Sequence, residues 1–526
     1  MSADAAREEY GAGMRFVPVL ALVACTAAET PPLPDDARPT DLGAVRGSVE
    51  GTSLVFRGIP FAAPPVDDLR WRAPAPAAAW TGIRDALAFG LPCVQVDEAG
   101  VVIGSEDCLT LNVWAPAALP AAPLPVLVFV HGGNNQIGCS CDGGNMPYYD
   151  GRYVAEHGPA IVVTLNYRLG PFGFLADPAL ADEHGATGNY ALADQLAALE
   201  WVQRNIAAFG GDPRRVMLFG HSAGSVNVTA LVASPRAAGL FSSAILHSGP
   251  SVVVDTGTVT RTWQAAEQTL GCTAAADRAA CLRAQPASAV ARVPGAVLGA
   301  PNDAQAQFYP TIDGQILAAS PLATIRAGRH NHVPVLIGTT ADEYSQLIDE
   351  IASGPVSDEA QYHAELQRLF GASLAAEVEA QYPAATYPSP RDALVAVVND
   401  VMEICPTRQL SGAFAGDPDV RRFIYTHSFP GPLARYHAAH GFDILLLFHD
   451  LALVGATSAN DAALADAMMQ YWVAFAATGD PNAAAGLPAW PSYAPQQDNY
   501  LALDWPLATA AGARTPQCDF WDSQLL

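Results

Sequence analysis

The stretch Val216-Met217-Leu218-Phe219-Gly220-His221-Ser222-Ala223-Gly224 decides the fold. Its apolar start predicts a buried strand, and the residues after Gly224 suit a helix. Between the two, the Gly-x-Ser-x-Gly pattern predicts a tight turn that exposes the serine at the end of the strand. Glycine at both ends avoids a Cβ where the backbone folds closely on itself. The helix end beneath the serine would offer free N–H groups and a favourable dipole to a developing negative charge. Ser222 is therefore a candidate nucleophile.

A second strand-like run, residues 127–130, leads into His131-Gly132-Gly133-Asn134. Paired glycines after a strand let backbone N–H groups point into a cleft, where they can stabilise the oxyanion of acyl transfer. A plain turn that ends the strand is the alternative interpretation. Because a candidate nucleophile lies downstream, we expect an oxyanion hole formed by the backbone N–H groups of Gly132, Gly133, Asn134 and Ala223.

Short apolar runs alternate with helical segments from residue 43 onward. The strand-like runs cover residues 126–130, 161–167, 216–219, 244–247, 333–339 and 422–427, and a helical pattern covers residues 192–209. Strands separated by helices predict an α/β fold with a mostly parallel central sheet flanked by helices. Residues 250–330 and 345–420 have weaker periodicity and are expected to form helical insertions over one end of the sheet. No composition break suggests a second domain, so one domain is expected over residues 43–526.

The composition narrows the classes of function. Half of the 526 residues are apolar, which is enough for a large core. Acidic residues number 52 against 27 basic ones, for a net charge of −25. Phosphate binding needs a basic face, so the charge argues against a nucleic-acid partner. No pattern implies a cofactor or a metal site, and the oligomeric state is left open.

The N-terminus resembles an export signal. Residues 14–25 combine one arginine with a short apolar stretch that is too short to span a bilayer. Residues 22–25 resemble a bacterial lipobox, so we expect a signal peptide over residues 1–24 and Cys25 as a candidate for lipidation. Ordinary secretion, with Cys25 near the cleavage site by chance, is the alternative. The proline-rich segment 25–42 is expected to be a linker that tethers the domain.

Several further motifs, in order, resemble the type-B carboxylesterases, the esterase/lipase family that includes the cholinesterases. They are Arg-Gly-Ile-Pro-Phe-Ala-Ala-Pro-Pro at 57–65, Glu-Asp-Cys-Leu-Thr-Leu-Asn-Val at 106–113, Asn-Tyr-Arg-Leu-Gly at 166–170 and Ala-Phe-Gly-Gly-Asp-Pro at 208–213. The likeness extends from about residue 43 to Trp521, and it points to a bacterial para-nitrobenzyl-esterase-like member. It implies an α/β-hydrolase fold and a serine esterase.

The resemblance also implies the other two members of a catalytic triad. In this fold the acid follows the serine along the chain, and the histidine follows the acid. The family places its acid on the Glu of an Asp-Glu pair, which corresponds to Glu343 in the segment 340–344. Tyr344 replaces the glycine that usually comes next, so Asp342 stays a rival.

The base is expected further along the chain. His440, in Ala-His-Gly-Phe-Asp-Ile at 439–444, resembles the family's His-Gly segment with its downstream acidic residue. His427, His437 and His449 are nearby competitors.

Two positions beside the chemistry depart from the family pattern. His221 stands where the family usually has Glu before the nucleophile, and Asn134 stands at the third glycine of the oxyanion run. Both changes could alter the substrate range or the pH profile. The loop between Cys93 and Cys108 contains neither Trp nor Tyr, which argues against a choline ester as substrate because cholinesterases hold the quaternary ammonium on an aromatic ring there.

The cysteines indicate an oxidising compartment, so we expect an exported protein that is extracellular or membrane-anchored. The resemblance implies disulfides between Cys93 and Cys108, Cys272 and Cys281, and Cys405 and Cys518. Cys139 and Cys141 are left over, and they could pair with each other or, less readily, bind a metal.

Together these features predict a serine carboxylic-ester hydrolase that works through Ser222, Glu343 and His440, a covalent acyl-enzyme and an oxyanion hole. Its partner would be a small-molecule ester. A lipase, thioesterase or amidase would use the same triad. A catalytically inactive, adhesion-type binding protein of this family is the third alternative, although such proteins are expected to lack a triad residue.

Overall fold

The structure is a computed structural model, which describes residues 32–141, 149–295, 308–417, 419–451, 455 and 458–524. The chain divides into a short N-terminal unit, Met1–Pro34, and a large unit, Asp35–Leu526. In the first unit only residues 32–34 are described, and they have no regular secondary structure. The expected signal peptide and Cys25 therefore lie outside the described residues.

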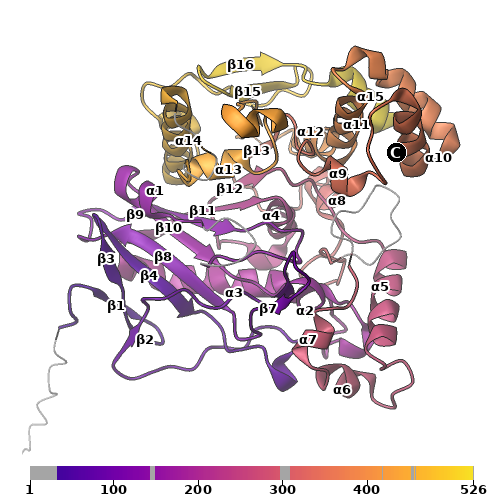
Figure 1. Ribbon diagram of the computed structural model, residues 1–526. Helices are drawn as coiled ribbons and strands as arrows, with labels where there is room; N and C mark the ends of the chain where they lie inside the picture. The colour runs from indigo at the N-terminus through magenta and orange to yellow at the C-terminus, as the bar shows by residue number, and fades with distance from the viewer. Residues whose placement is uncertain are drawn as a thin grey trace, which may run out of the picture. The chain divides into compact units, whose positions relative to one another are not determined.

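The large unit is built on an eleven-stranded sheet (Figure 1). From one edge to the other its strands are β16 (Ala508–Ala511), β15 (Asn499–Leu503), β14 (Val420–Tyr425), β13 (Val335–Thr340), β12 (Ser243–His247), β11 (Gly211–His221), β9 (Leu124–Val130), β10 (Ile161–Leu165), β8 (Thr110–Pro116), β4 (Ser53–Pro60) and β3 (Ser48–Glu50). Neighbours from β15 to β10 pair in parallel. The outer pairs are antiparallel. The expected mostly parallel sheet is therefore present, and all six predicted strand-like runs lie in it.

Both faces of the parallel strands are buried, because alternate side chains belong to two separate cores. Leu218 packs into the core that contains α3 (Tyr190–Asn205) and α4 (Ala223–Ala233). Its neighbour Phe219 packs into the core of α1 (Arg152–His157), α13 (Phe442–Leu447) and α14 (Ala459–Thr478). Burial on both faces explains the continuous apolar runs of these strands. The predicted helix at 192–209 is α3 followed by a 3₁₀ turn, Ile206–Phe209.

The two expected insertions are helical. Between β12 and β13 lie α5 (Thr256–Thr269), α6 (Arg278–Arg283), α7 (Ala287–Val290) and α8 (Pro321–Arg326). Between β13 and β14 lie α9 (Ile348–Ile351), α10 (Glu359–Gln381), α11 (Pro390–Asn399), a π-helical turn (Asp400–Ile404) and α12 (Cys405–Ala413). Together with the C-terminal α15 (Thr515–Gln524), several of these helices enclose a third core at the right of Figure 1.

Several small elements complete the unit. They are α2 (Gly170–Phe174) and two small sheets, one of β1 (Ala37–Thr40), β2 (Gly43–Arg46) and β5 (Ile83–Asp85), the other of β6 (Gln95–Val96) and β7 (Val102–Ile103). Strand β1 corrects the expected tether of residues 25–42. Its residues pair with β2 from Ala37↔Arg46 to Thr40↔Gly43, so the folded unit begins before residue 43.

Four disulfide bonds join the described cysteines. Three are the pairs that the family resemblance implied, Cys93–Cys108, Cys272–Cys281 and Cys405–Cys518. The fourth joins Cys139 to Cys141, which settles the question left open for these two residues in favour of pairing.

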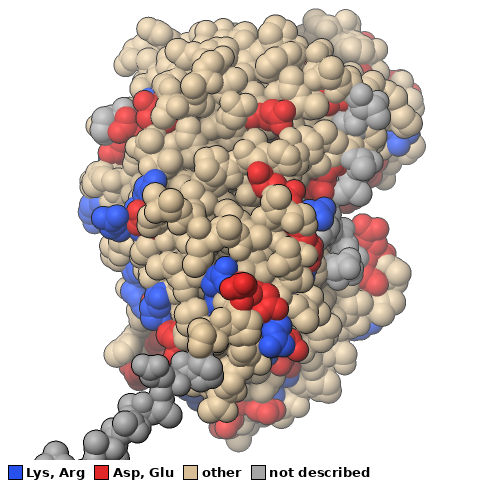
Figure 2. Space-filling view, turned by 90° about the vertical axis from the view of Figure 1, so that its left-hand side faces the viewer, with Lys and Arg blue, Asp and Glu red and all other residues tan. Residues whose placement is uncertain are grey.

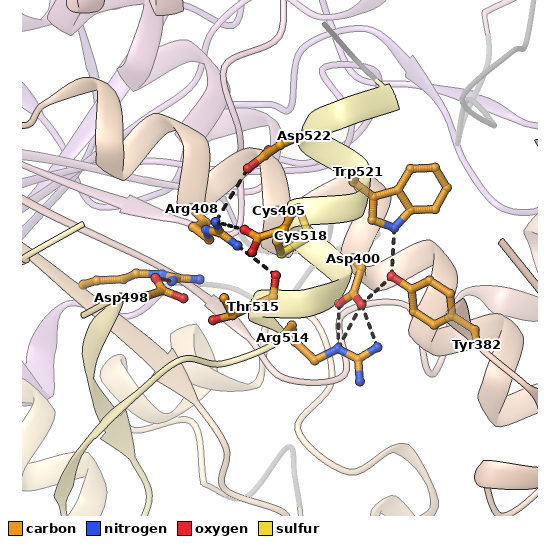
Figure 3. The surroundings of a disulfide bond; sticks show 12 residues. Tyr382, Asp400, Cys405, Arg408, Asp498, Arg514, Thr515, Cys518, Trp521 and Asp522 are labelled. Atoms are coloured by element: carbon orange, nitrogen blue, oxygen red, sulfur yellow. Dashed lines mark hydrogen bonds and ion pairs between the residues drawn. A yellow bond between two sulfur atoms is a disulfide. The ribbon is translucent and has the colours of Figure 1, made fainter. Parts of the chain in front are cut away.

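The C-terminal helix α15 is held by more than its disulfide (Figure 3). Arg514 forms an ion pair with the buried Asp400 at 2.6 Å. The hydroxyl of Tyr382 donates to Asp400 (2.7 Å) and accepts from the indole N–H of Trp521 (2.8 Å). These contacts fasten α15 to the π-helical turn and to the end of α10.

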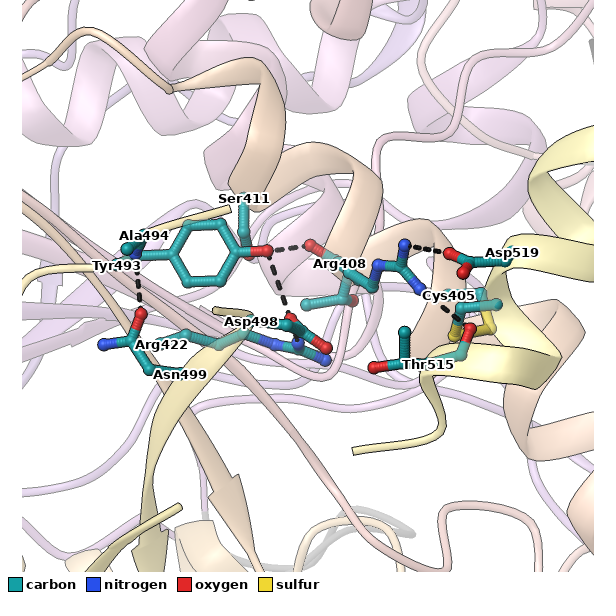
Figure 4. A network of polar contacts seen from close by, with 12 residues as sticks. Cys405, Arg408, Ser411, Arg422, Tyr493, Ala494, Asp498, Asn499, Thr515 and Asp519 are labelled. Carbon is teal, nitrogen blue, oxygen red and sulfur yellow. Dashed lines mark hydrogen bonds and ion pairs between the residues drawn. A yellow bond between two sulfur atoms is a disulfide. The ribbon is translucent and has the colours of Figure 1, made fainter. Parts of the chain in front are cut away.

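A second polar network lies beside it, between α12 and the sheet (Figure 4). Arg408 on α12 reaches Asp519 on α15 at 2.5 Å. Arg422 on β14 pairs with Asp498, which also accepts from the hydroxyl of Tyr493 at 3.1 Å. Both arginines have their charge matched by a carboxylate.

Charges are mixed on the face shown in Figure 2, where arginine and acidic side chains are interspersed among uncharged residues. The described part of this face has no continuous basic surface of the kind that phosphate backbones need. In the described ranges, every helix is too short or too polar to cross a bilayer.

Candidate active site

Ser222 occupies the sharp turn between β11 and α4. Its backbone has φ 57° and ψ −128°, a conformation that non-glycine residues rarely adopt. Its N–H donates to the carbonyl of His247 (2.9 Å), and its carbonyl accepts from the N–H of Val226 (3.1 Å). The end of β12 and the first turns of α4 therefore hold the turn in place. A Cβ on Gly220 or on Gly224 would collide with backbone atoms, which explains the two glycines. The side chain is partly exposed at the carboxyl edge of the sheet.

The glycine-rich loop after β9 lies directly beside this serine. A Cβ on Gly132 would come within 2.9 Å of the Cβ of Ser222. Gly133 and Asn134 have positive φ angles of 101° and 55°, and a turn closes when the N–H of Ile137 donates to the carbonyl of Gly133 (3.0 Å). This loop therefore brings its backbone close to Ser222.

Asn134, which replaces a glycine of the family pattern, is held in place by a side chain that the sequence did not indicate. The hydroxyl of Tyr309 donates to its Oδ1. The tyrosine is partly buried, and burial raises its pKa well above the ordinary value, so it stays a donor. The asparagine is therefore a fixed part of the loop.

Glu343 and His440 meet although 97 residues separate them. Glu343 is fully buried just beyond the end of β13, where one carboxylate oxygen accepts from the N–H of Thr340 (2.6 Å). Its other oxygen is 2.5 Å from Nδ1 of His440. The carboxylate therefore holds the imidazole in one orientation and leaves Nε2 available for proton transfer.

The rival residues have other partners. A carboxylate oxygen of Asp342 accepts from the N–H of Ala438 (3.3 Å). His427 bonds to carboxylates on both sides, and His449 stacks on Tyr153 with 3.5 Å between the ring centroids. His437 takes a positive φ of 53° at a turn. Among the described residues, the pair joined in the way a triad requires is Glu343 with His440.

The charges around His440 favour its protonated form. Burial acts to lower the pKa of this imidazole, but the carboxylates of Glu343, Glu403 and Asp443 outweigh burial, and the pKa is raised above its usual 6.5. Its side chain is 17% exposed, so the ring is accessible from one side. Such an imidazole is a stronger base than an ordinary histidine.

His221, the unusual neighbour of Ser222, lies against His440. Its ring centroid is 4.5 Å from that of His440. Burial, and then the nearby charge of His440, hold the pKa of His221 well below 6.5, so this side chain is neutral. Its Nε2 is buried and has no hydrogen-bond partner among the described residues. A neutral ring thus stands where the family pattern has a carboxylate.

Behind these two histidines lies a buried pair that the sequence did not predict. Trp472 donates to Nε2 of His247 (3.1 Å), and because an indole N–H can only donate, the proton of His247 is on Nδ1. This nitrogen therefore donates to Asp443 (2.7 Å). Burial opposes ionisation of Asp443, but the bond from His247 and the neighbouring histidines lower its pKa. Asp443 thus carries a negative charge close to the base.

Glu403 is a further residue that the sequence analysis missed. It lies on the π-helical turn and accepts from the hydroxyl of Tyr344 (3.4 Å), while Asn399 at the start of this turn accepts from the backbone N–H of Tyr344 (2.8 Å). Burial and the charge of Glu343 raise the pKa of Glu403 to about 8. π-helical turns often occur at functional sites. The only sequence signal is a pair of carboxylates, Asp400 and Glu403, within a largely apolar run.

The sheet, the strained serine and the buried Glu–His pair together define an enzyme of the α/β-hydrolase fold. Comparison with known proteins specifies the family. Residues 34–521 match the model of the Carboxylesterase family, and the chain belongs to that family. It is an ester-hydrolysing enzyme that acts on small-molecule esters.

Individual relatives agree with this assignment. The chain is 38% identical to the fumonisin B1 esterase of Sphingopyxis macrogoltabida over 465 residues, which cover 85% of this chain and 83% of the relative. It is 34% identical to the para-nitrobenzyl esterase of Bacillus subtilis over 480 residues, which cover 88% and 94%. A solved structure titled PNB esterase matches with a TM-score of 0.79 at 32% identity, over 92% of this chain and all of the other. The expected α/β-hydrolase fold is confirmed.

Proposed function

We propose that the chain hydrolyses carboxylic esters by covalent catalysis, with Ser222 as nucleophile, His440 as general base and Glu343 as the acid that orients the base. The observation that carries the proposal is the 2.5 Å bond from Glu343 to Nδ1 of His440. It occurs at the same edge of the sheet as a serine held in a strained turn. These are the parts of a serine-hydrolase triad.

The reaction would begin when His440 takes the proton of the Ser222 hydroxyl and the serine oxygen attacks the ester carbonyl. Glu343 and Asp443 stabilise the imidazolium that forms, because both are buried acids close to the ring. His440 then gives its proton to the departing alcohol. Water, activated by the same base, releases the acid from the serine.

The negative oxygen of the tetrahedral intermediate would be held by backbone N–H groups of the loop after β9 and of the start of α4. One such donor contributes roughly a hundredfold to a thousandfold in rate. The close approach of the glycine loop to the serine supports this assignment. The proposed donors are Gly132, Gly133, Asn134 and Ala223.

Ser222→Ala tests the proposal directly. With p-nitrobenzyl and p-nitrophenyl esters as probes, the variant should lose about a millionfold in kcat. Ser225→Ala is the matched control, because Ser225 lies three residues further on, in the first turn of α4, and among the described residues its hydroxyl bonds to the carbonyl of Gly249 (3.2 Å). The control should keep its activity.

A serine-directed organophosphate should label the wild type and Ser225→Ala but not Ser222→Ala. A folded Ser222→Ala protein that turns over esters at a rate near that of the wild type would contradict the proposal. A wild type with neither turnover nor labelling would indicate a binding protein instead.

Four disulfide bonds are typical of an exported protein. We propose that export uses residues 1–24 as a signal peptide and that Cys25 becomes the lipidated N-terminus, which would anchor the enzyme to a membrane. The lipobox-like residues 22–25 support this. Mass spectrometry of the mature protein tests it, since an unmodified N-terminus beyond Cys25 would contradict anchoring.

A further inference from the structure

Two histidines and an aspartate meet at the edge of the sheet opposite the candidate active site. His330 and His332 lie in the loop between α8 and β13, and Asp417 precedes β14. Strands β13 and β14 are parallel neighbours whose pairing begins with Val335↔Val420. The loops that enter both strands therefore meet at their amino ends, whereas Ser222 and Glu343 follow the carboxyl ends of their strands.

The carboxylate of Asp417 lies between the two imidazole rings. Its oxygens are 2.7 Å from Nε2 of His330 and 2.9 Å from Nδ1 of His332. One donor atom from each of the three residues lies within 4.8 Å of the others. The side chain of His330 is 2% exposed and that of His332 is 59% exposed, so the cluster is buried on one side and open to solvent on the other.

The hydrogen-bond partners of His332 are compatible with a cation bound at its Nδ1. Its Nδ1 faces Asp417, and its Nε2 faces the carbonyl oxygen of Gly328 at 3.2 Å. A neutral imidazole has a single N–H and can donate to only one of these two acceptors, whereas a protonated imidazole can donate to both. A metal ion at Nδ1 would leave Nε2–H free to donate to Gly328. A backbone carbonyl behind a ligating histidine is the usual second partner in metal sites.

The loop that carries both histidines is held rigidly before any ligand binds. Asn331, between them, donates from its side chain to the carbonyls of Leu231 (3.2 Å), Val232 (3.0 Å) and Ser234 (2.8 Å), at the C-terminal end of α4. His330 also packs edge-on against Phe414, with 5.2 Å between ring centroids. Because the ligand positions are already fixed, little conformational entropy would be lost on binding.

We propose that His330 Nε2, His332 Nδ1 and Asp417 bind one divalent transition-metal ion of the zinc type. Two imidazoles and one carboxylate form a donor set that suits zinc and disfavours magnesium and calcium, which prefer oxygen ligands. Ligand atoms around a tetrahedral zinc ion are roughly 3.3 Å apart, so each imidazole nitrogen would move about half an ångström away from the carboxylate oxygen that it now contacts. Water would complete the coordination on the exposed side of His332.

Because the site adjoins the C-terminal end of α4, the bound ion would brace the helix whose first turn follows Ser222. The metal would thus support the fold at a distance from the chemistry. The ion takes no part in ester hydrolysis.

Isothermal titration of metal-free, untagged full-length protein with zinc chloride tests the proposal. The wild type should show one saturable site, and X-ray absorption at the zinc edge should show nitrogen and oxygen ligands without sulfur. His332→Ala and Asp417→Asn should each weaken binding by at least about a hundredfold, since even the loss of a second partner costs ten- to a hundredfold. Both should keep their circular dichroism and their esterase activity.

His363→Ala is the matched control, because His363 also bonds a carboxylate, that of Glu379 at 2.8 Å, but lacks a second histidine on that carboxylate. It should bind zinc as the wild type does. A wild type without a saturable site would overturn the proposal, as would variants of His332 and Asp417 that bind zinc like the wild type. Esterase activity is measured separately, so failure here leaves the proposed function untouched.

Discussion

Replacing His221 by glutamate should move the acid limb of the pH profile of kcat/KM to higher pH. His221 is neutral, and its ring centroid is 4.5 Å from that of His440, the proposed base. A carboxylate at this distance would favour the imidazolium form of the base. The base would then be protonated, and so inactive, at a higher pH than in the wild type.

The size of the effect follows from the distance. Two unit charges 4.5 Å apart interact by about 3.7 kcal/mol at an effective dielectric constant of about 20. That energy corresponds to roughly 2.7 pKa units. Because the side chain of His440 is 17% exposed, solvent and salt screen part of the interaction. We therefore expect an upward shift of about one to two units.

The assay is kcat/KM for a soluble acetate ester between about pH 5 and pH 9, followed by titration of the released acid. His221→Gln is the matched control, because an uncharged side chain of the same length as glutamate should leave the acid limb where the wild type has it. Coincident limbs for His221→Glu and His221→Gln, in proteins with wild-type circular dichroism, would refute the electrostatic reasoning.

In the wild type, the raised pKa of His440 means that kcat/KM should fall as the pH drops through a value above 6.5, and a pH–rate profile checks this. Glu343→Gln should lower kcat by about ten-thousandfold, since the amide no longer holds the imidazole in the right tautomer; steady-state kinetics with the same ester would show it, and a loss below tenfold would contradict the assignment. The double variant Cys405→Ala/Cys518→Ala should lose about 5 kcal/mol of unfolding free energy. The disulfide closes a loop with a sequence separation of 113, and without it the unfolded chain regains the entropy of that loop. Chemical denaturation measures the loss, and the Cys272–Cys281 pair, 9 residues apart, is the comparison at about 2.5 kcal/mol.

The parallel sheet and the nucleophile turn could be predicted because both depend on residues close together in sequence. The apolar run before Gly220 is a strand buried on both faces, and the two glycines are needed where backbone meets backbone. The proposed acid and base could not be paired in this way, since Glu343 and His440 are 97 positions apart in the sequence. Their pairing came from the family resemblance and not from local pattern.

Rival residues could be separated only in three dimensions. Asp342 and Glu343 are adjacent in sequence, yet their carboxylates reach Ala438 and His440 respectively. Sequence patterns indicate the residues around the proposed triad even less clearly. The position of Glu403 depends on a π-helical turn, and no residue pattern predicts this irregularity of the backbone.

Composition alone does not place the N-terminal boundary of the folded unit, for a physical reason. Several prolines before residue 42 suggested an extended linker, but extended backbone also suits a strand, and Pro39 sits opposite Ala44 in the pairing of β1 with β2. The metal-binding proposal has a similarly weak sequence signal, since His-x-His and Asp417 are 85 residues apart when counted from His332.

The way α15 is fastened has a consequence for a chain that is shortened before this helix. Cys518 joins Cys405, which directly follows the π-helical turn, and Arg514 joins Asp400 on that turn. The same turn carries Glu403, next to Glu343 and Tyr344. Glu343, the proposed catalytic acid, therefore gains its outermost support from α15 and the residue before it, and a chain cut before Arg514 would lack that support.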